Sequence, residues 1–242
     1  MLWLIAGLVI FLGTHSLRVL GEDYRRRLIA QWGEMPWKAG YSLLSIAGLA
    51  LLIYGYGLAR QAPVPLYDLP LGLRHASTLL SWFAMVLLVA AYIPGNWFKV
   101  KWRHPMVLGV KLWAFAHLLA NGNLADVILF GSFLLWAVAS FSAARKRDRA
   151  AAAEVPGLGH PGSFDQGPGS TKASGIAESS APMAPSAARE GLEATGSVEG
   201  AVAGDISKPS KTILAVVGGT LVWVGFVFDW HASLIGVSPL GR

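Results

Sequence analysis

The 242-residue sequence contains no cysteine, and only 14% of its residues are charged. Without cysteine it can build neither a disulfide framework nor a thiolate metal site, so a metal or cofactor must be held by histidine, carboxylate, methionine or tyrosine. Phosphate-binding glycine loops, nucleophile elbows and zincin motifs are also absent. These absences exclude the enzyme classes that depend on those motifs.

Hydrophobic residues, in contrast, make up 54% of the chain, and the mean hydropathy is +0.49, which is typical of a polytopic membrane protein. Each apolar stretch approaches the roughly 20 residues that cross a bilayer as a helix. None shows the strict alternation of a barrel strand. We therefore predict an all-α transmembrane bundle of about six spans, at residues 1–20, 38–58, 76–94, 105–121, 124–141 and 212–230.

The first span is expected to be a retained helix rather than a signal peptide, because no Lys or Arg precedes it and no A-x-A cleavage pattern follows. The net charge of +6 would suggest nucleic acid in a soluble protein, but here the basic residues lie between spans, so no nucleic-acid partner is predicted. They cluster after spans one, three and five. This asymmetry predicts a bacterial inner-membrane protein with cytoplasmic basic loops and both termini periplasmic, since the other side has only Arg60, Arg74 and Arg242.

The segment before the last span has a different composition, rich in Ala, Gly, Pro and Ser. Such a segment buries too little apolar surface to offset its ordering entropy, which predicts a disordered cytoplasmic linker. The expected organisation is a compact five-helix membrane unit at 1–141, a linker at 142–211, and a sixth helix with its tail at 212–242, held on a long leash.

The most unusual span runs from residue 104 to residue 123 and carries Lys111 and His117 within an apolar sequence. Titratable groups are costly in lipid, so each predicts a partner, a cavity or a cofactor. The span ends at Asn121-Gly122-Asn123, and these residue types tolerate a left-handed turn, which predicts a tight antiparallel hairpin with the next span. We expect the functional centre in this region.

The polar residues of this span have structural as well as functional interpretations. His104 precedes Pro105, which suits the first position of a helix, so His104 is expected at the N-cap near the cytoplasmic interface. Lys111 either binds an anionic ligand or pairs with a carboxylate, for which Asp126 is the candidate. His117 lies about 20 Å and 220° beyond His104 on a helix, so the two cannot share a ligand from one face.

Histidines on other segments are the expected partners. His15, near the end of the first span, is either a polar contact to a neighbouring helix or a metal ligand. Two buried histidines on different transmembrane helices are typical of bis-histidine haem ligation. His75 and His231 are further candidates and are more typical of interface residues, whereas His160 falls in the predicted linker.

Several motifs, taken together, resemble the NnrU family. They are the first span ending H-S-L-R, then W-K-A-G-Y-S-L, Y-G-Y-G-L-A-R, A-Y-I-P-G, the stretch H-P-M-V-L-G-V-K-L-W-A-F-A-H-L-L-A-N-G, and the tail H-A-S-L-I-G-V-S-P-L. The resemblance implies a link to bacterial denitrification, through expression or assembly of nitrite and nitric oxide reduction. The family also includes the 15-cis-zeta-carotene isomerases, which are haem b membrane enzymes that isomerise a central cis double bond.

The resemblance implies that His15 and His117 are the ligands of haem b, and that His104 matches a histidine that is important in the isomerases without being a ligand. With Lys111, these are the predicted cofactor-binding residues. Helical rise places His15 about 7 Å and His117 about 18 Å from the cytoplasmic face. Depth alone would instead pair His15 with His104 and His117 with His75, and both schemes stay open.

Two classes of function follow from the sequence and the resemblance. The first is a haem b protein, which acts either in nitrite and nitric oxide metabolism or in cis–trans isomerisation of a polyene; its partners are the bilayer and a hydrophobic small molecule or nitric oxide. The second is a membrane factor without haem that supports assembly or transport for a reductase. A methyltransferase is a weaker alternative, because R-H-P at 103–105 lacks the expected E-x-x-x-x-H pair. The sequence does not specify an oligomeric state.

Overall fold

The computed structural model describes residues 1–153 and 208–235, and over these ranges every regular element is helical. An isolated β-bridge between Pro65 and Asn123 joins two loops. The all-α prediction is therefore confirmed for the described residues. Most of the predicted linker, residues 154–207, lies outside them, as does His160.

Six apolar helices coincide with the six predicted spans. They are α1 (Leu2–Leu20), α3 (Glu34–Ala59), α4 (Leu71–Ala90), α6 (Pro105–Leu118), α7 (Leu124–Ala153) and α8 (Pro209–Gly225). By length and composition α3, α4, α7 and α8 can cross a membrane, whereas the apolar parts of α1 and α6 are shorter. The 14 residues of α6 extend only about 21 Å, against a hydrocarbon core of about 30 Å.

The structure adds short elements that the sequence did not predict: α2 (Glu22–Trp32), α5 (Trp97–Trp102), a π-helical turn η2 (Phe226–Trp230) and α9 (His231–Ile235). Helix α5 begins at the fully buried Asn96, whose side chain accepts a hydrogen bond from the Lys99 backbone N–H at 3.0 Å. The amide nitrogen of Asn96 donates to the Ala90 and Ile93 carbonyls. One buried side chain therefore ties the end of α4 to the start of α5.

Glycines set the contact between the antiparallel helices α1 and α3. A Cβ on Gly55 would lie 2.2 Å from the backbone nitrogen of Leu4, and one on Gly7 would lie 2.5 Å from that of Leu52. Only glycine permits so close an approach of two backbones. The contact buries Leu4 and Leu52 and fixes the course of α1 toward His15.

Helix α8 packs against α4 in the same compact unit as the first seven helices. A Cβ on Gly219 would lie 2.4 Å from the Val86 Cα, and Trp82 donates a hydrogen bond to the Thr220 hydroxyl at 3.0 Å. The Lys208 N–H also bonds the Gly95 carbonyl at 2.9 Å. Helix α8, which follows the predicted linker, is therefore attached to α4 and to its connection to α5 by close backbone contact and hydrogen bonds.

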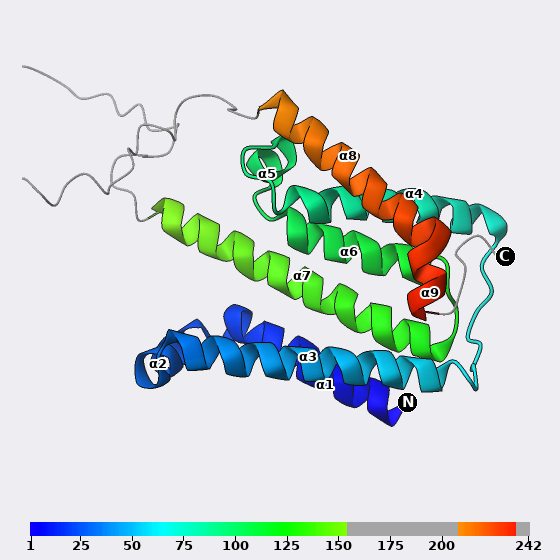
Figure 1. Ribbon diagram of the computed structural model, residues 1–242, viewed down its shortest axis with the longest axis horizontal. Helices are drawn as coiled ribbons and strands as arrows, with labels where there is room; N and C mark the ends of the chain where they lie inside the picture. The colour runs from blue at the N-terminus through cyan, green and yellow to red at the C-terminus, as the bar shows by residue number, and fades with distance from the viewer. Residues whose placement is uncertain (154–207, 236–242) are drawn as a thin grey trace, which may run out of the picture. The chain divides into compact units, whose positions relative to one another are not determined.

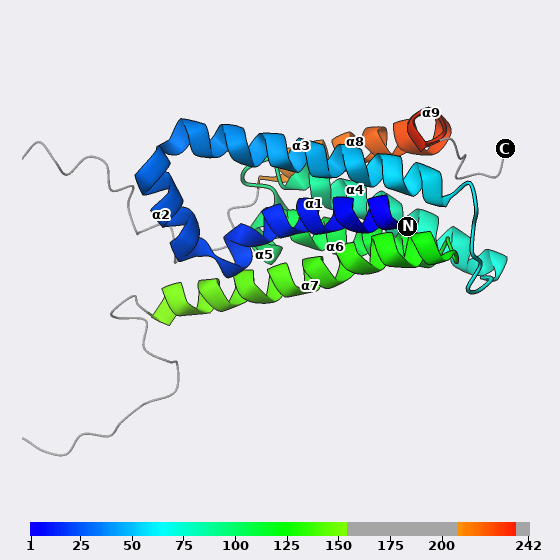
Figure 2. The same cartoon turned by 90° about the horizontal axis from the view of Figure 1, so that it is seen from below.

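The predicted hairpin is present, with α6 and α7 antiparallel (Figures 1 and 2). Its physical reason differs from the prediction. Among the described glycines only Gly33 and Gly95 have positive φ, so Gly122 is not in a left-handed conformation. A Cβ on Gly122 would instead lie 1.9 Å from the Tyr67 carbonyl oxygen, because the loop after α3 crosses the turn at this point.

Helix α7 also continues well beyond the predicted end of its span. Residues 142–153, assigned above to the linker, are helical, since alanine and arginine are good helix formers. Figure 1 shows that α2, α5 and the last turns of α7 lie at one end of this unit, here called the basic end. The turn between α6 and α7 lies at the opposite end, here called the hairpin end (Figures 1 and 2).

Candidate functional site

His15 lies in α1 with one ring nitrogen held by its own helix. Its Nδ1 is 2.8 Å from the Phe11 carbonyl oxygen. A carbonyl can only accept, so Nδ1 carries the proton and Nε2 keeps its lone pair. The half-buried ring lies 5.7 Å from the Tyr41 ring on α3 and 6.2 Å from the Trp136 ring on α7. The His15 ring thus contacts both neighbouring helices through aromatic rings and keeps one nitrogen suited to bind a metal.

His117 repeats this arrangement on α6. Its Nδ1 donates to the Trp113 carbonyl at 2.8 Å, four residues earlier in the helix. Its ring stacks on Phe130 of α7, with 4.5 Å between centroids and 29° between planes. The tautomer is again the one with a free Nε2, which is the form that ligates metals when a backbone carbonyl holds the other nitrogen. The two histidines that the resemblance singled out therefore share one local geometry.

A continuous row of aromatic rings joins these two histidines. His15 contacts Phe11 at 4.3 Å, Trp113 contacts His117 at 4.9 Å, and Phe133 of α7 lies 5.9 Å from Phe11 and 5.5 Å from Trp113. The rings of His15 and His117 do not contact each other in the described part of the chain. Their donor set fits haem b in kind, since both offer a neutral imidazole beside aromatic faces. Phe11, Phe133 and Trp113 would have to move for both to reach one iron.

His104 occupies the predicted N-cap position before Pro105, but its side chain makes no capping bond. Its Nε2 donates instead to the Asp148 carboxylate of α7 at 3.0 Å, and Arg103 approaches the same carboxylate at 3.7 Å. This hydrogen bond and the adjacent positive charges hold the pKa of Asp148 below its usual value. Asp148 lies past Arg145, beyond the apolar part of α7. His104 therefore links α6 to α7 at the basic end, and its Nε2 is engaged.

Two further described histidines lie on α4 and α9. His75 is exposed on α4. His231, at the start of α9, lies within electrostatic range of His117. The structure therefore places His231 near His117, a proximity that the sequence could not indicate because it depends on how α8 packs.

Lys111 is half-buried on α6 and makes no hydrogen bond or ion pair with the described residues. It lies six positions before His117, about 240° around the helix, so the two side chains leave from different faces. Asp126, its candidate partner, is 3% exposed and bonded elsewhere. It accepts hydrogen bonds from the Tyr56 hydroxyl at 2.5 Å and from the backbone and side chain of Asn123. The predicted Lys111–Asp126 pair is therefore not formed.

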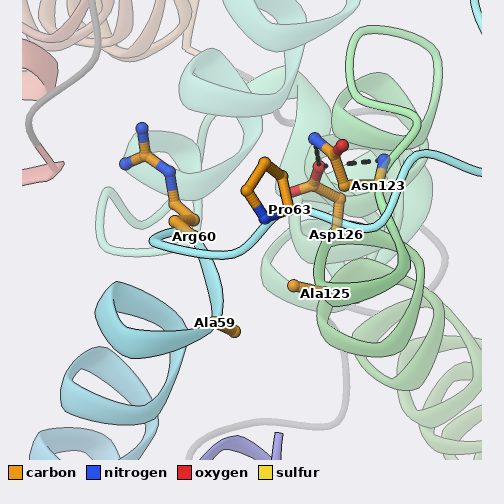
Figure 3. A pocket seen from close by; sticks show the side chains of 6 residues that line it. All are labelled: Ala59, Arg60, Pro63, Asn123, Ala125 and Asp126. Carbon is orange, nitrogen blue, oxygen red and sulfur yellow. Dashed lines mark hydrogen bonds between the residues drawn. The ribbon is translucent and has the colours of Figure 1, made fainter.

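A small pocket opens at the hairpin end, beside Asp126 (Figure 3). Its volume is about 210 Å³, below the range of about 300–1,000 Å³ typical of small-molecule sites. None of the predicted cofactor-binding residues lines it; the lining residues are Ala59, Arg60, Pro63, Asn123, Ala125 and Asp126. Over the described ranges, no three His, Cys, Asp or Glu side chains come together as a metal site.

The sequence analysis did not identify two polar atoms on α7. Trp136 Nε1 and Ser140 Oγ are buried and have no hydrogen-bond partner among the residues that the structure describes. They are four residues apart, one helical turn, and the Trp136 ring stands edge-on to His15 at 87°. The i, i+4 spacing of Trp136 and Ser140 is visible in the sequence W-A-V-A-S. Their lack of hydrogen-bond partners depends on tertiary packing and is not visible there.

Comparison with known proteins yields one match that covers nearly the whole chain. The model of a family described as NnrU protein matches residues 3–239. No curated protein and no solved structure matches. The matched region includes His15, His104, Lys111 and His117. This chain belongs to the NnrU family.

Proposed function

We propose that this protein binds haem b within its membrane helices, with His15 and His117 as the ligating side chains. The observation that carries the proposal is their shared tautomer. Each Nδ1–H is bonded to the carbonyl four residues earlier, which leaves Nε2 unprotonated. A histidine that served only as a polar contact between helices would direct a ring nitrogen at another helix. Both of these rings meet other helices through aromatic contacts.

The chain's own residues would prepare the site in two ways. The backbone carbonyls of Phe11 and Trp113 orient the imidazoles and raise their basicity. The rings of Phe11, Phe133 and Phe130 exclude water and offer flat apolar surfaces. When bound, haem b supplies an iron whose oxidation state and axial ligands can change. Such a centre suits either a role in nitrite and nitric oxide metabolism or the isomerisation of a polyene.

Lys111 is the proposed counter-ion for an anionic ligand on a different face of α6 from His117, since a lysine within an apolar helix favours an anion close by. The proposed topology has six spans in the bacterial inner membrane, with the basic end in the cytoplasm and both termini in the periplasm. It rests on the concentration of Lys and Arg in the connections at the basic end.

The test is the absorption spectrum of the full chain, purified in detergent from haem-replete cells. We expect a Soret band that shifts on reduction and that His15→Ala and His117→Ala each abolish or move. His75→Ala is the matched control, because His75 is exposed on α4. Retention of the band in His117→Ala, with loss in His15→Ala and in His104→Ala, would support the His15–His104 pairing instead.

A second function, a membrane factor without haem that supports reductase assembly or transport, is favoured by one observation. The row formed by Phe11, Phe133 and Trp113 fills the space between the two histidines and satisfies their ring faces. A wild-type protein without Soret absorption would exclude the first function and favour the second. If the band is present, nitric oxide binding to the ferrous form tests the nitrogen-oxide role, and a carotenoid-producing host tests isomerisation.

A further inference from the structure

Three lysines at the basic end have no counter-charge among the described residues. They are Lys101 on α5, and Lys208 and Lys211 at the start of α8, and all three are exposed. Their side chains make no hydrogen bond or ion pair within the ranges that the structure describes. Helices α4, α5, α6 and α8, which pack together here, contain no Asp or Glu. Asp148, on α7, is already engaged by His104 and Arg103.

Hydrogen bonds hold the start of α8 beside α5. The Trp97 backbone N–H donates to the Thr212 hydroxyl at 2.9 Å, and the Lys208 backbone N–H donates to the Gly95 carbonyl at 2.9 Å. The lysines of α8 therefore lie next to the first turn of α5. Together with the lysine of α5 they make up what is here called the lysine surface, which consists of Lys101, Lys208 and Lys211.

Helix α5 has one buried and one exposed face. Phe98 is buried and its ring lies 6.1 Å from the Phe83 ring of α4. At about 100° of rotation per residue, Val100, Trp97 and Lys101 fall within an arc of about 100° on another side of the helix, and all three are exposed. An exposed tryptophan beside an aliphatic residue and a cation is the composition of a helix at a membrane–water interface.

The direction of α5 agrees with such a position. Figure 1 shows it nearly end-on, whereas α4, α6 and α8 run across the view, so α5 lies crosswise to the long helices. It follows the end of α4 and adjoins the start of α8. Where those helices cross the bilayer, α5 therefore lies along its surface, at the level of the lipid headgroups. Tyr92, just past the end of α4, is 77% exposed and is also typical of this level.

We propose that the lysine surface binds the headgroup of an anionic phospholipid. The lipid phosphate supplies the missing counter-charge through charge-assisted hydrogen bonds from the three ammonium groups. The acyl chains then follow the apolar side of α8, where Ile213 and Leu214 are exposed in the first turns. A zwitterionic phospholipid fits less well, because its own amine neutralises the phosphate. The inference requires neither haem nor a particular role for His15.

The experiment titrates the full-length protein, delipidated in a neutral detergent, with phosphatidylglycerol or with phosphatidylcholine of the same acyl chains. We expect phosphatidylglycerol to raise the melting temperature saturably and by more than phosphatidylcholine does. Lys101→Gln combined with Lys208→Gln and Lys211→Gln should need at least about tenfold more phosphatidylglycerol for half of the rise. The reason is that each lysine facing an anionic headgroup strengthens binding about fivefold.

The matched control is Lys146→Gln combined with Arg147→Gln and Arg149→Gln. It removes the same number of charges from exposed positions on the last turns of α7, where residues 142–153 include no aromatic residue. This variant should keep the wild-type response. Glycerol 3-phosphate, which has the phosphate but no acyl chains, should cause no rise at the same concentrations.

Three outcomes would overturn the inference. Equal rises with the two lipids would show that the headgroup charge is not recognised. Equal loss of the response in both triple variants would show that net charge, and not the lysine surface, attracts the lipid. A rise with glycerol 3-phosphate as large as that with the lipid would assign the lysines to a free phosphate instead.

Discussion

At the scale of single residues, the hairpin end depends on a buried carboxylate whose partners are all neutral. Asp126 accepts hydrogen bonds from Tyr56 on α3 and from Asn123 at the start of α7. The bond between the Asp126 side chain and the Asn123 N–H is that of a capping box. Tyr56 adds the link between helices. Asp126, which was predicted to pair with Lys111, instead holds α3 to α7.

Tyr56→Phe tests this link. The substitution leaves a buried carboxylate with one donor fewer, which should lower the free energy of unfolding by about 1–3 kcal/mol. Thermal unfolding in detergent measures the change. Tyr54→Phe is the control, because Tyr54 lies on the same helix with 58% of its surface exposed. Equal melting temperatures for the two variants would show that the Tyr56–Asp126 bond contributes nothing to stability.

The histidine site shows what single residues can indicate from the sequence. His15 and His117 were identified by family resemblance, and in the structure each forms an Nδ1–carbonyl bond within its own helix. Helical rise also predicted that the two differ in depth, and in the structure three other rings separate them. The identity of those rings, and the unpaired atoms of Trp136 and Ser140, depend on how α1, α6 and α7 pack, which no local pattern encodes.

At the scale of helices, α1 reaches its position through contact with α3. Gly55→Ala would place a methyl group 2.2 Å from the Leu4 nitrogen, whereas Gly57, on the same helix, has nothing within 4 Å of the equivalent position. We expect Gly55→Ala to separate the helices, lower the melting temperature and displace His15. Gly57→Ala should be neutral or stabilising by up to about 1 kcal/mol, from helix propensity. Equal melting curves would contradict the close packing.

The His104–Asp148 contact predicts a dependence of stability on pH. Asp148 has a lowered pKa in the folded protein because of His104, with Arg103 and Arg145 adding positive charge nearby. A depressed carboxyl pKa stabilises the fold above the unfolded value, about 3.9, and the contribution is lost as pH falls below it. Melting temperatures measured from neutral to acid pH should therefore fall less steeply in Asp148→Asn.

The control for this variant is Asp68→Asn, since Asp68 is exposed in the loop after α3 and makes no ion pair with the described residues. It should retain the wild-type pH profile. If the profiles of all three proteins coincide, the contact between His104 and Asp148 does not link α6 to α7 in solution.

Helices were predicted correctly from the sequence where a long apolar stretch is enough to define them, and they were missed or cut short elsewhere. The six long apolar stretches coincide with helices, because a run of that length has little alternative in lipid. Helices α2 and α5 were missed, since they are short and mix basic with aromatic residues, a composition that also suits loops. The end of α7 was placed too early, at residue 141, because only the apolar span was predicted as helix, although the charged residues at 145–149 continue a helix well.

At the scale of the whole molecule, the distribution of positive charge is the feature that bears on orientation. The connections that carry α2 and α5, and the last turns of α7, lie together at the basic end. Successive long helices run in opposite directions in Figure 1, which brings these connections to the same end. The basic connections therefore lie together at one end, and the proposal is that this whole end faces the cytoplasm.

The absence of cysteine makes that proposal directly testable. Gln31 on α2 and Gln61 after α3 are both exposed, and they lie at the basic end and beyond the far end of α3 respectively. Each single-cysteine variant carries the only thiol in the chain. A membrane-impermeant maleimide added to cells with a permeabilised outer membrane should label Gln61→Cys and reach Gln31→Cys only after lysis. The reverse pattern would place the basic end in the periplasm, and labelling of both before lysis would show that the two glutamines share one side of the membrane.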